Sequence, residues 1–204
     1  MSGDATSMST RLPLLPVGAD GLLATGFKIP KGTQLVSTML VNNEIGVIQP
    51  ISELAEAAHQ AGALFLCDAV QGFGRMEIPD GPDLIAISAH KIHGPKGIGA
   101  LWVRNGIQLE PLLYGGGQEG GLRSGTLSPA LCAGFGVAAK VAQQRLEADA
   151  IHVQQLWNVA ISMLPNAVPF ACDAMNALTT SVNFGQSLRI AQAMLPPALT
   201  AASG

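Results

Sequence analysis

Polar side chains that can do acid–base or covalent chemistry follow two predicted strands of this sequence. Asp68 and Gln71 come after one apolar run, and a second run ends in a Ser-Ala-His-Lys segment that holds Ser88, His90 and Lys91. In a sheet of parallel strands, ligands bind beyond the carboxyl ends of the strands. The pattern therefore predicts a crevice in which a carboxylate, an amide, an imidazole and an amine converge on a small molecule.

Each of these residues also has a purely structural interpretation. Asp68 can cap a turn, His90 can be an ordinary surface histidine, and Lys91 can be a solvated charge. That interpretation is favoured for any one of the residues alone. Their joint occurrence at two successive strand ends favours a functional site.

Two glycine-rich segments raise the alternative of a nucleotide-binding module. The segment at 94–99 lacks the Lys-Ser or Lys-Thr pair that follows the last glycine of a Walker phosphate loop, because Ile98 follows Gly97. The run at 115–121 either offers backbone N–H groups to an anion or permits tight turns. Spacing alone leaves both interpretations of this run open.

Short apolar runs alternate with helical patterns along the chain. A helix is predicted after Pro50, because apolar residues recur with helical spacing until Gly62, and a long helix is predicted from Ser128-Pro129 to about residue 146 or beyond. A further helix is predicted near the carboxyl terminus, and strands are predicted at 35–41, 63–67, 84–88, 98–103 and 178–184. The alternation predicts an α/β fold with a mostly parallel sheet flanked by helices, in which the third and fourth strands are central.

The composition excludes several functional classes. Of the 204 residues, 48% are apolar and only 12% are charged, so the chain can bury a sizeable core and is not disordered as a whole. The formal net charge is −3 and lysine and arginine form no cluster, which argues against nucleic acid or an anionic membrane as partner. No apolar run approaches the roughly 18 to 20 residues of a membrane helix. A small metabolite is the expected partner.

Three cysteines, Cys67, Cys132 and Cys172, are spaced too widely for a disulfide framework or a zinc site. This spacing, with an amino terminus that lacks the features of a secretory signal, predicts a reducing, cytoplasmic location. Cys67 falls in a predicted buried strand and Cys132 in a predicted apolar helix, so both are expected to be inert core thiols. Cys172 falls in a predicted loop.

Four long segments of the sequence resemble those of the cysteine desulfurase family. They are VNNEIGVIQPI at 41–51, CDAVQ at 67–71, ISAHKIHGPKGIGALWV at 87–103 and YGGGQEGGLRSGTLS at 114–128. This family belongs to the class V aminotransferase-like enzymes of fold type I, which use pyridoxal 5'-phosphate (PLP). The resemblance covers roughly residues 12–185 and implies part of a PLP-binding large domain.

The resemblance also implies roles for individual residues. Lys91 matches the lysine that binds PLP covalently, and Asp68 matches the aspartate that pairs with the pyridine nitrogen. Lys91 and His90 are the predicted catalytic residues. The predicted cofactor-binding residues are Asn43, Asp68, Gln71 at the phenolic oxygen, Ser88 and His90 at the phosphate, Lys91, and Thr126 at the phosphate of a neighbouring subunit. A homodimer with shared sites follows from the match of Thr126.

The implied reaction converts L-cysteine to L-alanine and passes sulfur to an acceptor protein for iron–sulfur cluster or thio-cofactor synthesis. Family members are about twice as long as this chain, and none of its cysteines matches their nucleophile. Gly120 stands where the family commonly has arginine. The expected organisation is an irregular segment at 1–11, a partial large domain at 12–150, and a connecting helix with the start of a small domain at 151–204. The alternative is an inactive fragment or a binding or dimerisation subunit that retains part of the PLP site and works with a complementing chain.

Overall fold

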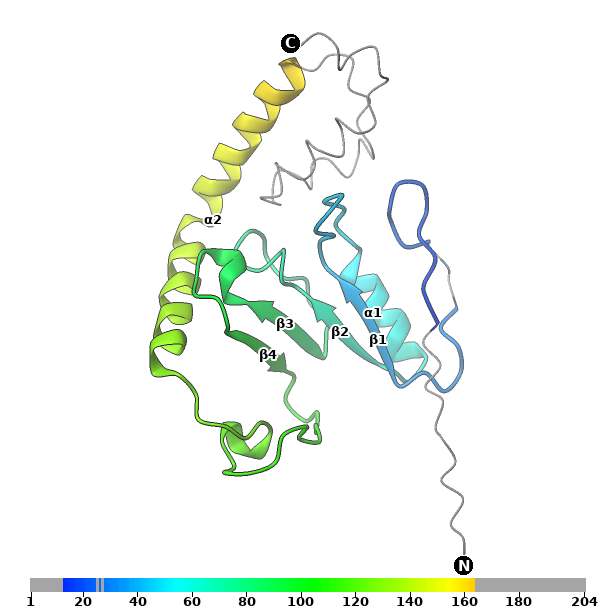
Figure 1. Ribbon diagram of the computed structural model, residues 1–204. Helices are drawn as coiled ribbons and strands as arrows, with labels where there is room; N and C mark the ends of the chain where they lie inside the picture. The colour runs from blue at the N-terminus through cyan, green and yellow to red at the C-terminus, as the bar shows by residue number, and fades with distance from the viewer. Residues whose placement is uncertain (1–12, 25, 27, 164–204) are drawn as a thin grey trace, which may run out of the picture.

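The computed structural model describes residues 13–24, 26 and 28–163 (Figure 1). Its elements follow the chain in the order β1 (Leu35–Met39), α1 (Ile51–Gln60), β2 (Leu64–Asp68), β3 (Leu84–Ser88), the 3-10 helix η1 (Ala89–Ile92), β4 (Gly99–Val103), the 3-10 helix η2 (Glu119–Gly121) and α2 (Pro129–Met163). The strand predicted at 178–184, the helix predicted near the carboxyl terminus, and Cys172 lie outside the described residues.

The four described strands form one sheet in the order β1-β2-β3-β4. The first three strands run parallel, and β4 runs antiparallel to β3, which confirms the predicted mostly parallel sheet. The prediction that residues 98–103 form a central strand is wrong within the described part of the chain. There, β4 lies at the end of the sheet, and Leu101 and Trp102 are about half exposed. An apolar run predicts that a strand is buried, but it does not identify the neighbouring strand or helix that packs against it.

Helix α1 packs against one face of β1 and β2 and forms the core with them. Its buried side chains have the helical spacing that the sequence predicted: Ile51, Leu54, Ala55 and Ala58. They belong to the same buried cluster as Phe65 of β2, which is fully covered. Gly62 follows the helix with a left-handed φ of 77°, a conformation that commonly ends a helix. Each large apolar side chain buried here contributes about 1.5–3 kcal/mol, so this packing fixes the position of β2.

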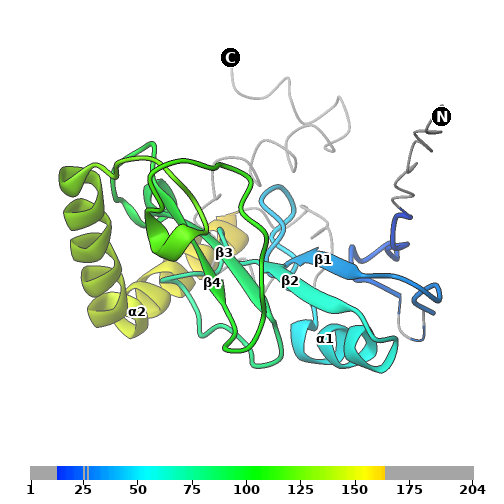
Figure 2. The same ribbon diagram turned by 90° about the horizontal axis from the view of Figure 1, so that it is seen from below.

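The two faces of the sheet differ in how they are covered. Side chains alternate between the faces along each strand. Val36, Phe65 and Cys67 are buried on the α1 side, whereas Met39 and Asp68 point to the other side. Figure 2 shows α1 on one side of β1 and β2 and no described helix on the other. We call the second side the open face; the strand register assigns to it Leu35, Ser37, Met39, Leu64, Leu66, Asp68, Leu84, Ala86, Ser88, Gly99, Leu101 and Val103.

Helix α2 is 35 residues long, about 52 Å, and packs against η1 through small residues. It begins as predicted, with the Ser128 carbonyl accepting the Cys132 N–H at 3.1 Å, and it continues well past residue 146. Gly134 lies against Pro95, and Ala138 lies against Gly94. No helix in the described part of the chain is long and apolar enough to cross a membrane.

The prediction that Cys132 is a core thiol is wrong, because this residue is exposed. The small residues of α2 that lie against Pro95, Gly94 and Gly74 recur every four positions, at Gly134, Ala138 and Ala142. Cys132 lies two positions before this stripe, and a shift of two residues turns a helical side chain to a different face. The prediction for Cys67 is confirmed, since its side chain is fully buried in β2.

The buried carboxylate of Asp83 connects three parts of the chain through hydrogen bonds and an ion pair. It accepts hydrogen bonds from the Phe65 N–H and from His59 Nε2, each at 2.8 Å, and its other oxygen lies 3.4 Å from Arg104. Burial opposes ionisation of Asp83, but these partners outweigh it and lower the pKa of the carboxyl group. Asp83 thus links β2, α1 and the chain after β4.

Candidate functional site

The predicted site residues that follow β2 and β3 lie at one edge of the sheet. β1, β2 and β3 run parallel, so their carboxyl ends meet there (Figure 1). Asp68 ends β2 and is aligned with Met39 of β1 and Ala86 of β3. Ser88 ends β3, two positions beyond Ala86, and therefore shares the open face with Asp68. The fold brings these two residues together on one surface.

The Asp68 carboxylate is half-buried and has unused hydrogen-bonding capacity. Its Oδ1 accepts the Val70 N–H at 3.0 Å, and no other described residue donates a hydrogen bond to the carboxylate. Burial and the charge of Asp68 raise the pKa of the neighbouring Cys67 thiol to about 12. Asp68 therefore places a negative charge with a free acceptor position at the edge of the open face.

Gln71 lies in the tight turn that follows β2. Gly72 and Phe73 donate backbone hydrogen bonds to the Ala69 carbonyl at 3.0 and 2.8 Å, which closes this turn. Gln71 is only 7% exposed, and its side chain makes no hydrogen bond to another described residue. Because buried amides are normally hydrogen-bonded, Gln71 has donor and acceptor capacity available for a ligand.

The short helix η1 carries His90 and Lys91 directly beyond β3. Ser88 Oγ and His90 Nδ1 lie 2.8 Å apart and share a hydrogen bond. The Gly94 N–H closes the turn by donating to the Ala89 carbonyl at 2.9 Å. Lys91 is half-buried, whereas His90 is exposed. The hydroxyl, the imidazole and the amine therefore follow one another in a closed turn at the sheet edge.

Arg75, which no sequence pattern singles out, contacts this turn. Arg75 Nη2 donates to the main-chain carbonyl of Lys91 at 2.5 Å. Burial lowers the pKa of Arg75, and the charge of Asp149 in α2 acts in the opposite direction. The acceptor is a main-chain carbonyl 16 residues away. Every residue has such a carbonyl, so the sequence gives no indication of this contact.

Asn43 and Thr126 are placed differently with respect to this edge. Asn43 is half-buried in the loop after β1, where Asn42 Oδ1 accepts the N–H groups of Glu44 at 2.8 Å and Ile45 at 3.1 Å. Thr126 is exposed and belongs to the loop between β4 and α2, which lies at the end of the sheet away from η1 (Figure 1). Asn43 therefore follows the carboxyl end of β1 at this edge, whereas the loop of Thr126 starts from the opposite end of the sheet.

The glycine run at 115–121 forms tight turns that nearby side chains close. Ser124 Oγ accepts the Gly117 N–H at 3.3 Å, and Gln118 Oε1 accepts the Gly125 N–H at 2.9 Å. Gly120, the position where the resemblance leads us to expect arginine, has a left-handed φ of 64°, which glycine adopts at little cost. These contacts favour the turn interpretation of the run over an anion site.

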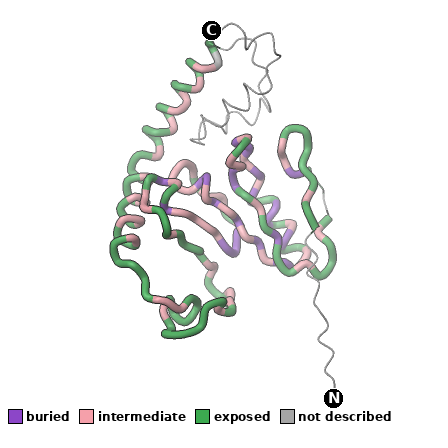
Figure 3. Tube along the Cα trace, in the orientation of Figure 1, coloured by how far each residue is buried: buried purple, intermediate pink, exposed green. Residues whose placement is uncertain are grey.

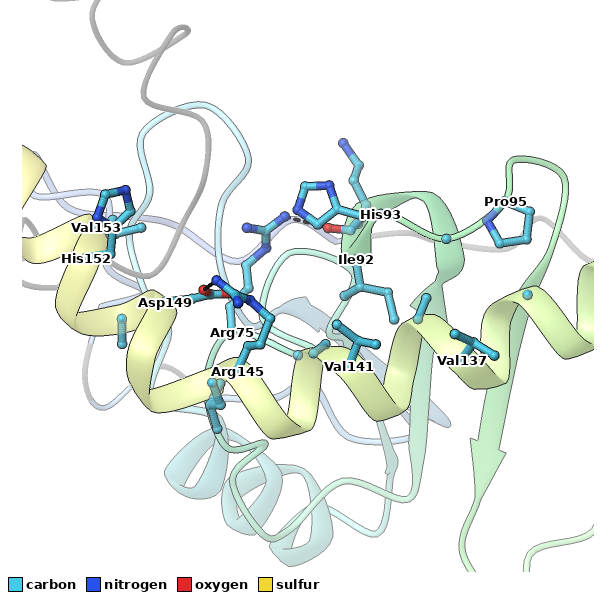
Figure 4. A pocket seen from close by; sticks show the side chains of 18 residues that line it. Arg75, Ile92, His93, Pro95, Val137, Val141, Arg145, Asp149, His152 and Val153 are labelled. Carbon is cyan, nitrogen blue, oxygen red and sulfur yellow. Dashed lines mark hydrogen bonds and ion pairs between the residues drawn. The ribbon is translucent and has the colours of Figure 1, made fainter.

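A groove of about 680 Å³ lies between η1 and α2, next to this edge (Figure 4). Ile92 and Val141 belong to its apolar lining, and Lys91 lines it as well. Arg145 and Asp149 of α2 form an ion pair at 2.7 Å within it. Helix α2 therefore supplies the second wall beside Lys91.

Comparison with known proteins identifies the family. The profile of the family described as "Aminotransferase class-V" matches residues 9–189. The chain is 46% identical over 154 residues to "Cysteine desulfurase IscS" of Rickettsia rickettsii (strain Iowa), which covers 73% of this chain and 38% of that protein. It is 44% identical over 165 residues to the protein of the same name from Rickettsia typhi, which covers 78% of this chain and 40% of that protein. The chain thus spans about two fifths of the length of these relatives.

Solved structures show the same likeness. A "NifS-like protein" superposes with a TM-score of 0.72 at 34% identity, covering 78% of this chain and 46% of that chain. The DndA protein from Streptomyces lividans superposes with a TM-score of 0.69 at 35% identity, covering 78% of this chain and 49% of that one. These superpositions confirm the predicted α/β fold as part of a larger one. From its sequence and its fold, the chain belongs to the aminotransferase class-V family and is a partial-length relative of the cysteine desulfurases.

Proposed function

We propose that this chain forms the PLP-binding part of a cysteine desulfurase, with Lys91 as the residue that holds the cofactor. The family reaction would convert L-cysteine to L-alanine and pass the sulfur to an acceptor protein. The observation that carries the proposal is the placement of Asp68 and Ser88 on one open face, with Lys91 directly beyond β3. In this proposal, residues 12–150 belong to the large domain and residues 151–204 lead into the small domain.

The chemistry of the residues at this edge fits PLP. Asp68 offers an anionic acceptor to a protonated pyridine nitrogen, since its carboxylate has a free acceptor position among the described residues. Gln71 offers a buried amide without a described partner to the phenolic oxygen. Ser88 and His90 offer a hydroxyl and an imidazole to the phosphate, and Asn43 lies in the adjoining loop. Each polar group that PLP presents therefore has a chemically matched residue at the edge.

The residues of the chain have separable tasks in this proposal. When bound, PLP supplies an electron sink that stabilises negative charge at the α-carbon of an amino acid. Asp68 would favour the protonated ring nitrogen, because a nearby negative charge favours a cation. Lys91 would hold the cofactor through its Nζ and then move the proton at the substrate α-carbon, with His90 beside it.

A second copy of the chain is part of the proposal. Thr126 belongs to the loop after β4, and β4 runs antiparallel to β3, so this loop leaves the sheet at the end opposite η1 (Figure 1). We propose that Thr126 contacts the phosphate at the site of a neighbouring subunit in a homodimer. The remaining parts of a desulfurase site would come from a complementing chain or from residues outside the described part.

The described cysteines favour a second candidate, a cofactor-binding subunit without sulfur transfer. Cys67 is fully buried and its pKa is about 12, so it is not a thiolate at neutral pH. Cys132 is exposed near the start of α2, before the part of the helix that packs on η1. Within the described residues, therefore, neither cysteine supplies a nucleophile beside Lys91.

Spectroscopy with PLP tests the proposal. The purified chain is titrated with PLP, and the visible absorbance of the lysine-bound cofactor is recorded for the wild type, Lys91→Ala and Lys96→Ala. Lys96 is an exposed lysine in the following loop and serves as the matched control. We expect the band in the wild type and in Lys96→Ala and its loss in Lys91→Ala. An unchanged band in Lys91→Ala would refute the assignment.

Addition of L-cysteine separates the two candidates. Alanine and sulfide are measured after the cofactor has been loaded onto the wild-type chain. Their production supports the desulfurase, whereas PLP binding without turnover supports the cofactor-binding subunit.

A further inference from the structure

The side chain of Arg75 connects the turn after β2 to the main chain of η1. Its Nη2 donates to the Lys91 carbonyl at 2.5 Å, a hydrogen bond from a charged donor and therefore a strong one. Figure 4 shows the Arg75 side chain between α2 and the segment that carries Ile92 and His93. Arg75 thus holds the backbone of the residue whose amine the proposed function uses.

Close packing holds the turn that carries Arg75. Gly74 has a left-handed φ of 74°, and a Cβ at this position would lie 2.8 Å from Ile92 Cγ2 and 2.9 Å from Ala142 Cβ. The backbone at residue 74 is therefore in direct contact with both η1 and α2. Arg75 also donates its own N–H to the Gly72 carbonyl at 3.0 Å, which fixes the start of the side chain. The guanidinium reaches Lys91 from a rigid base.

Asp149 of α2 lines the same groove as the Arg75 guanidinium. Arg75 is half-buried, and its Nε is fully covered without a hydrogen-bond partner among the described residues. The negative charge of Asp149 favours the charged form of Arg75. Arg145 holds Asp149 in place through its Nη2 at 2.7 Å and its Nε at 3.4 Å. Among the described residues, the Arg75 guanidinium makes one hydrogen bond, to the Lys91 carbonyl.

We propose that Arg75 is a positioning residue for Lys91: it fixes the main chain of η1 so that the Lys91 amine is presented to PLP in one orientation. This inference rests on the proposed function, because it concerns the same lysine.

The chain contains a matched control for this role. Arg104 also donates from its Nη2 to main-chain carbonyls, to Gly81 at 2.5 Å and Pro82 at 2.9 Å, and it also neighbours a carboxylate, Asp83. It lies just beyond the carboxyl end of β4, whereas η1 faces the start of that strand. Arg104→Met removes comparable contacts without touching η1.

The first test measures PLP bound to the full chain. We compare the wild type, Arg75→Met, Arg75→Lys and Arg104→Met by PLP titration and by visible circular dichroism per bound cofactor, which reports the orientation of the ring. We expect Arg75→Met to raise the Kd for PLP about tenfold and to weaken the dichroism, since a hydrogen bond from a charged donor is lost. Arg75→Lys should have a Kd for PLP and a dichroism between those of the wild type and Arg75→Met. Arg104→Met should match the wild type in both measurements.

The second test needs no cofactor. Hydrogen exchange of the Gly94 amide reports the closed turn of η1, and exchange of the Leu54 amide in α1 is the internal reference. Arg75→Met should speed exchange at Gly94 severalfold and leave Leu54 unchanged. If Arg75→Met does not fold, Arg75→Gln takes its place. We then expect smaller changes in the same direction, because a neutral N–H donor makes a weaker hydrogen bond than a charged one.

The outcomes separate this inference from the proposed function. If the wild type does not bind PLP at Lys91, the proposed function and this inference both fail. If the wild type binds PLP at Lys91 and Arg75→Met matches it in Kd, dichroism and Gly94 exchange, only the inference is overturned. An equal loss in Arg104→Met would also overturn it, because the effect would then follow from general destabilisation.

Discussion

The two faces of the sheet contrast in what they hold. On the α1 side, Phe65 and the apolar stripe of α1 are fully covered, and Figure 3 shows the buried residues gathered there. On the open face, Met39 is 37% exposed, and the polar residues Asp68 and Ser88 lie at its edge. Stability and the proposed chemistry are therefore assigned to opposite sides of the same strands. Substitutions on the two sides should have different consequences.

Helix α2 repeats this contrast along its length. The small residues around Ala138 and Ala142 pack on η1 and on the turn at Gly74. Elsewhere the helix presents large apolar side chains to solvent, including Val137, which is 63% exposed. The chain spans about two fifths of its curated relatives, and such faces are typical of surfaces that pack against another part of a larger assembly.

The largest loss of stability is expected from shortening a buried side chain on the α1 side of the sheet. Phe65→Ala should lower the free energy of unfolding by about 3–5 kcal/mol, because it leaves a cavity under α1. Met39→Ala on the open face should lower it by about 1 kcal/mol or less, because much of that side chain is already in water. Urea unfolding of both variants measures the difference. Equal losses would contradict the assignment of stability to the α1 side.

Removal of the buried carboxylate of Asp83 should cause the second largest loss of stability. Asp83→Ala leaves the Phe65 N–H and His59 without their acceptor, and we expect a loss of about 2–4 kcal/mol in urea unfolding. Because the folded pKa lies below the usual 3.8, the ionised group stabilises the fold above that pH, and its contribution disappears as the pH falls through the lower folded value. The difference between wild type and Asp83→Ala should therefore shrink below pH 3.8. A difference independent of pH would show that the charge of Asp83 is not involved.

Alanine substitutions at two glycines with the same backbone conformation test how closely the turn at Gly74 packs against η1 and α2. Gly74 and Gly117 have φ of 74° and 73°, but a Cβ at Gly74 meets Ile92 and Ala142, whereas at Gly117 it meets nothing within 4 Å. Gly74→Ala should cost about 2–3 kcal/mol, and Gly117→Ala about 1 kcal/mol, the backbone strain alone. Thermal unfolding compares the two. A cost at Gly117 equal to that at Gly74 would contradict the close contact.

The smallest effect on stability is expected at the edge of the open face. Ser88→Ala removes one hydrogen bond to His90 and should lower the free energy of unfolding by about 0.5–1 kcal/mol. The same variant should bind PLP more weakly than the wild type, which a titration measures. A variant that loses stability but keeps its PLP affinity would reverse the proposed separation of the two faces.

Much of this fold is readable from local patterns. The boundaries of β3 and the stripe of α1 follow from apolar runs and helical spacing, because these signals need only neighbouring residues. The edge position of β4 was not predicted, since it depends on which strands are its neighbours. The exposure of Cys132 was also missed, because α2 packs through a stripe of small residues rather than through its large apolar ones.

The candidate site divides in the same way. The placement of Asp68 and Ser88 follows from the general rule that parallel strands end at a common edge. This rule does not identify Arg75, because its acceptor is a main-chain carbonyl 16 residues away along the chain. Residue types alone do not predict a contact between a side chain and a main-chain atom far away in the sequence.

The most direct test of the account is to map where PLP attaches. The chain is incubated with PLP, the link is reduced with borohydride, and the modified peptide is identified by mass spectrometry. We predict a single modified residue, Lys91, and a sharp loss of labelling in Asp68→Asn. Labelling spread over exposed lysines such as Lys96 and Lys140, with Lys91 unmodified, would contradict the central claim.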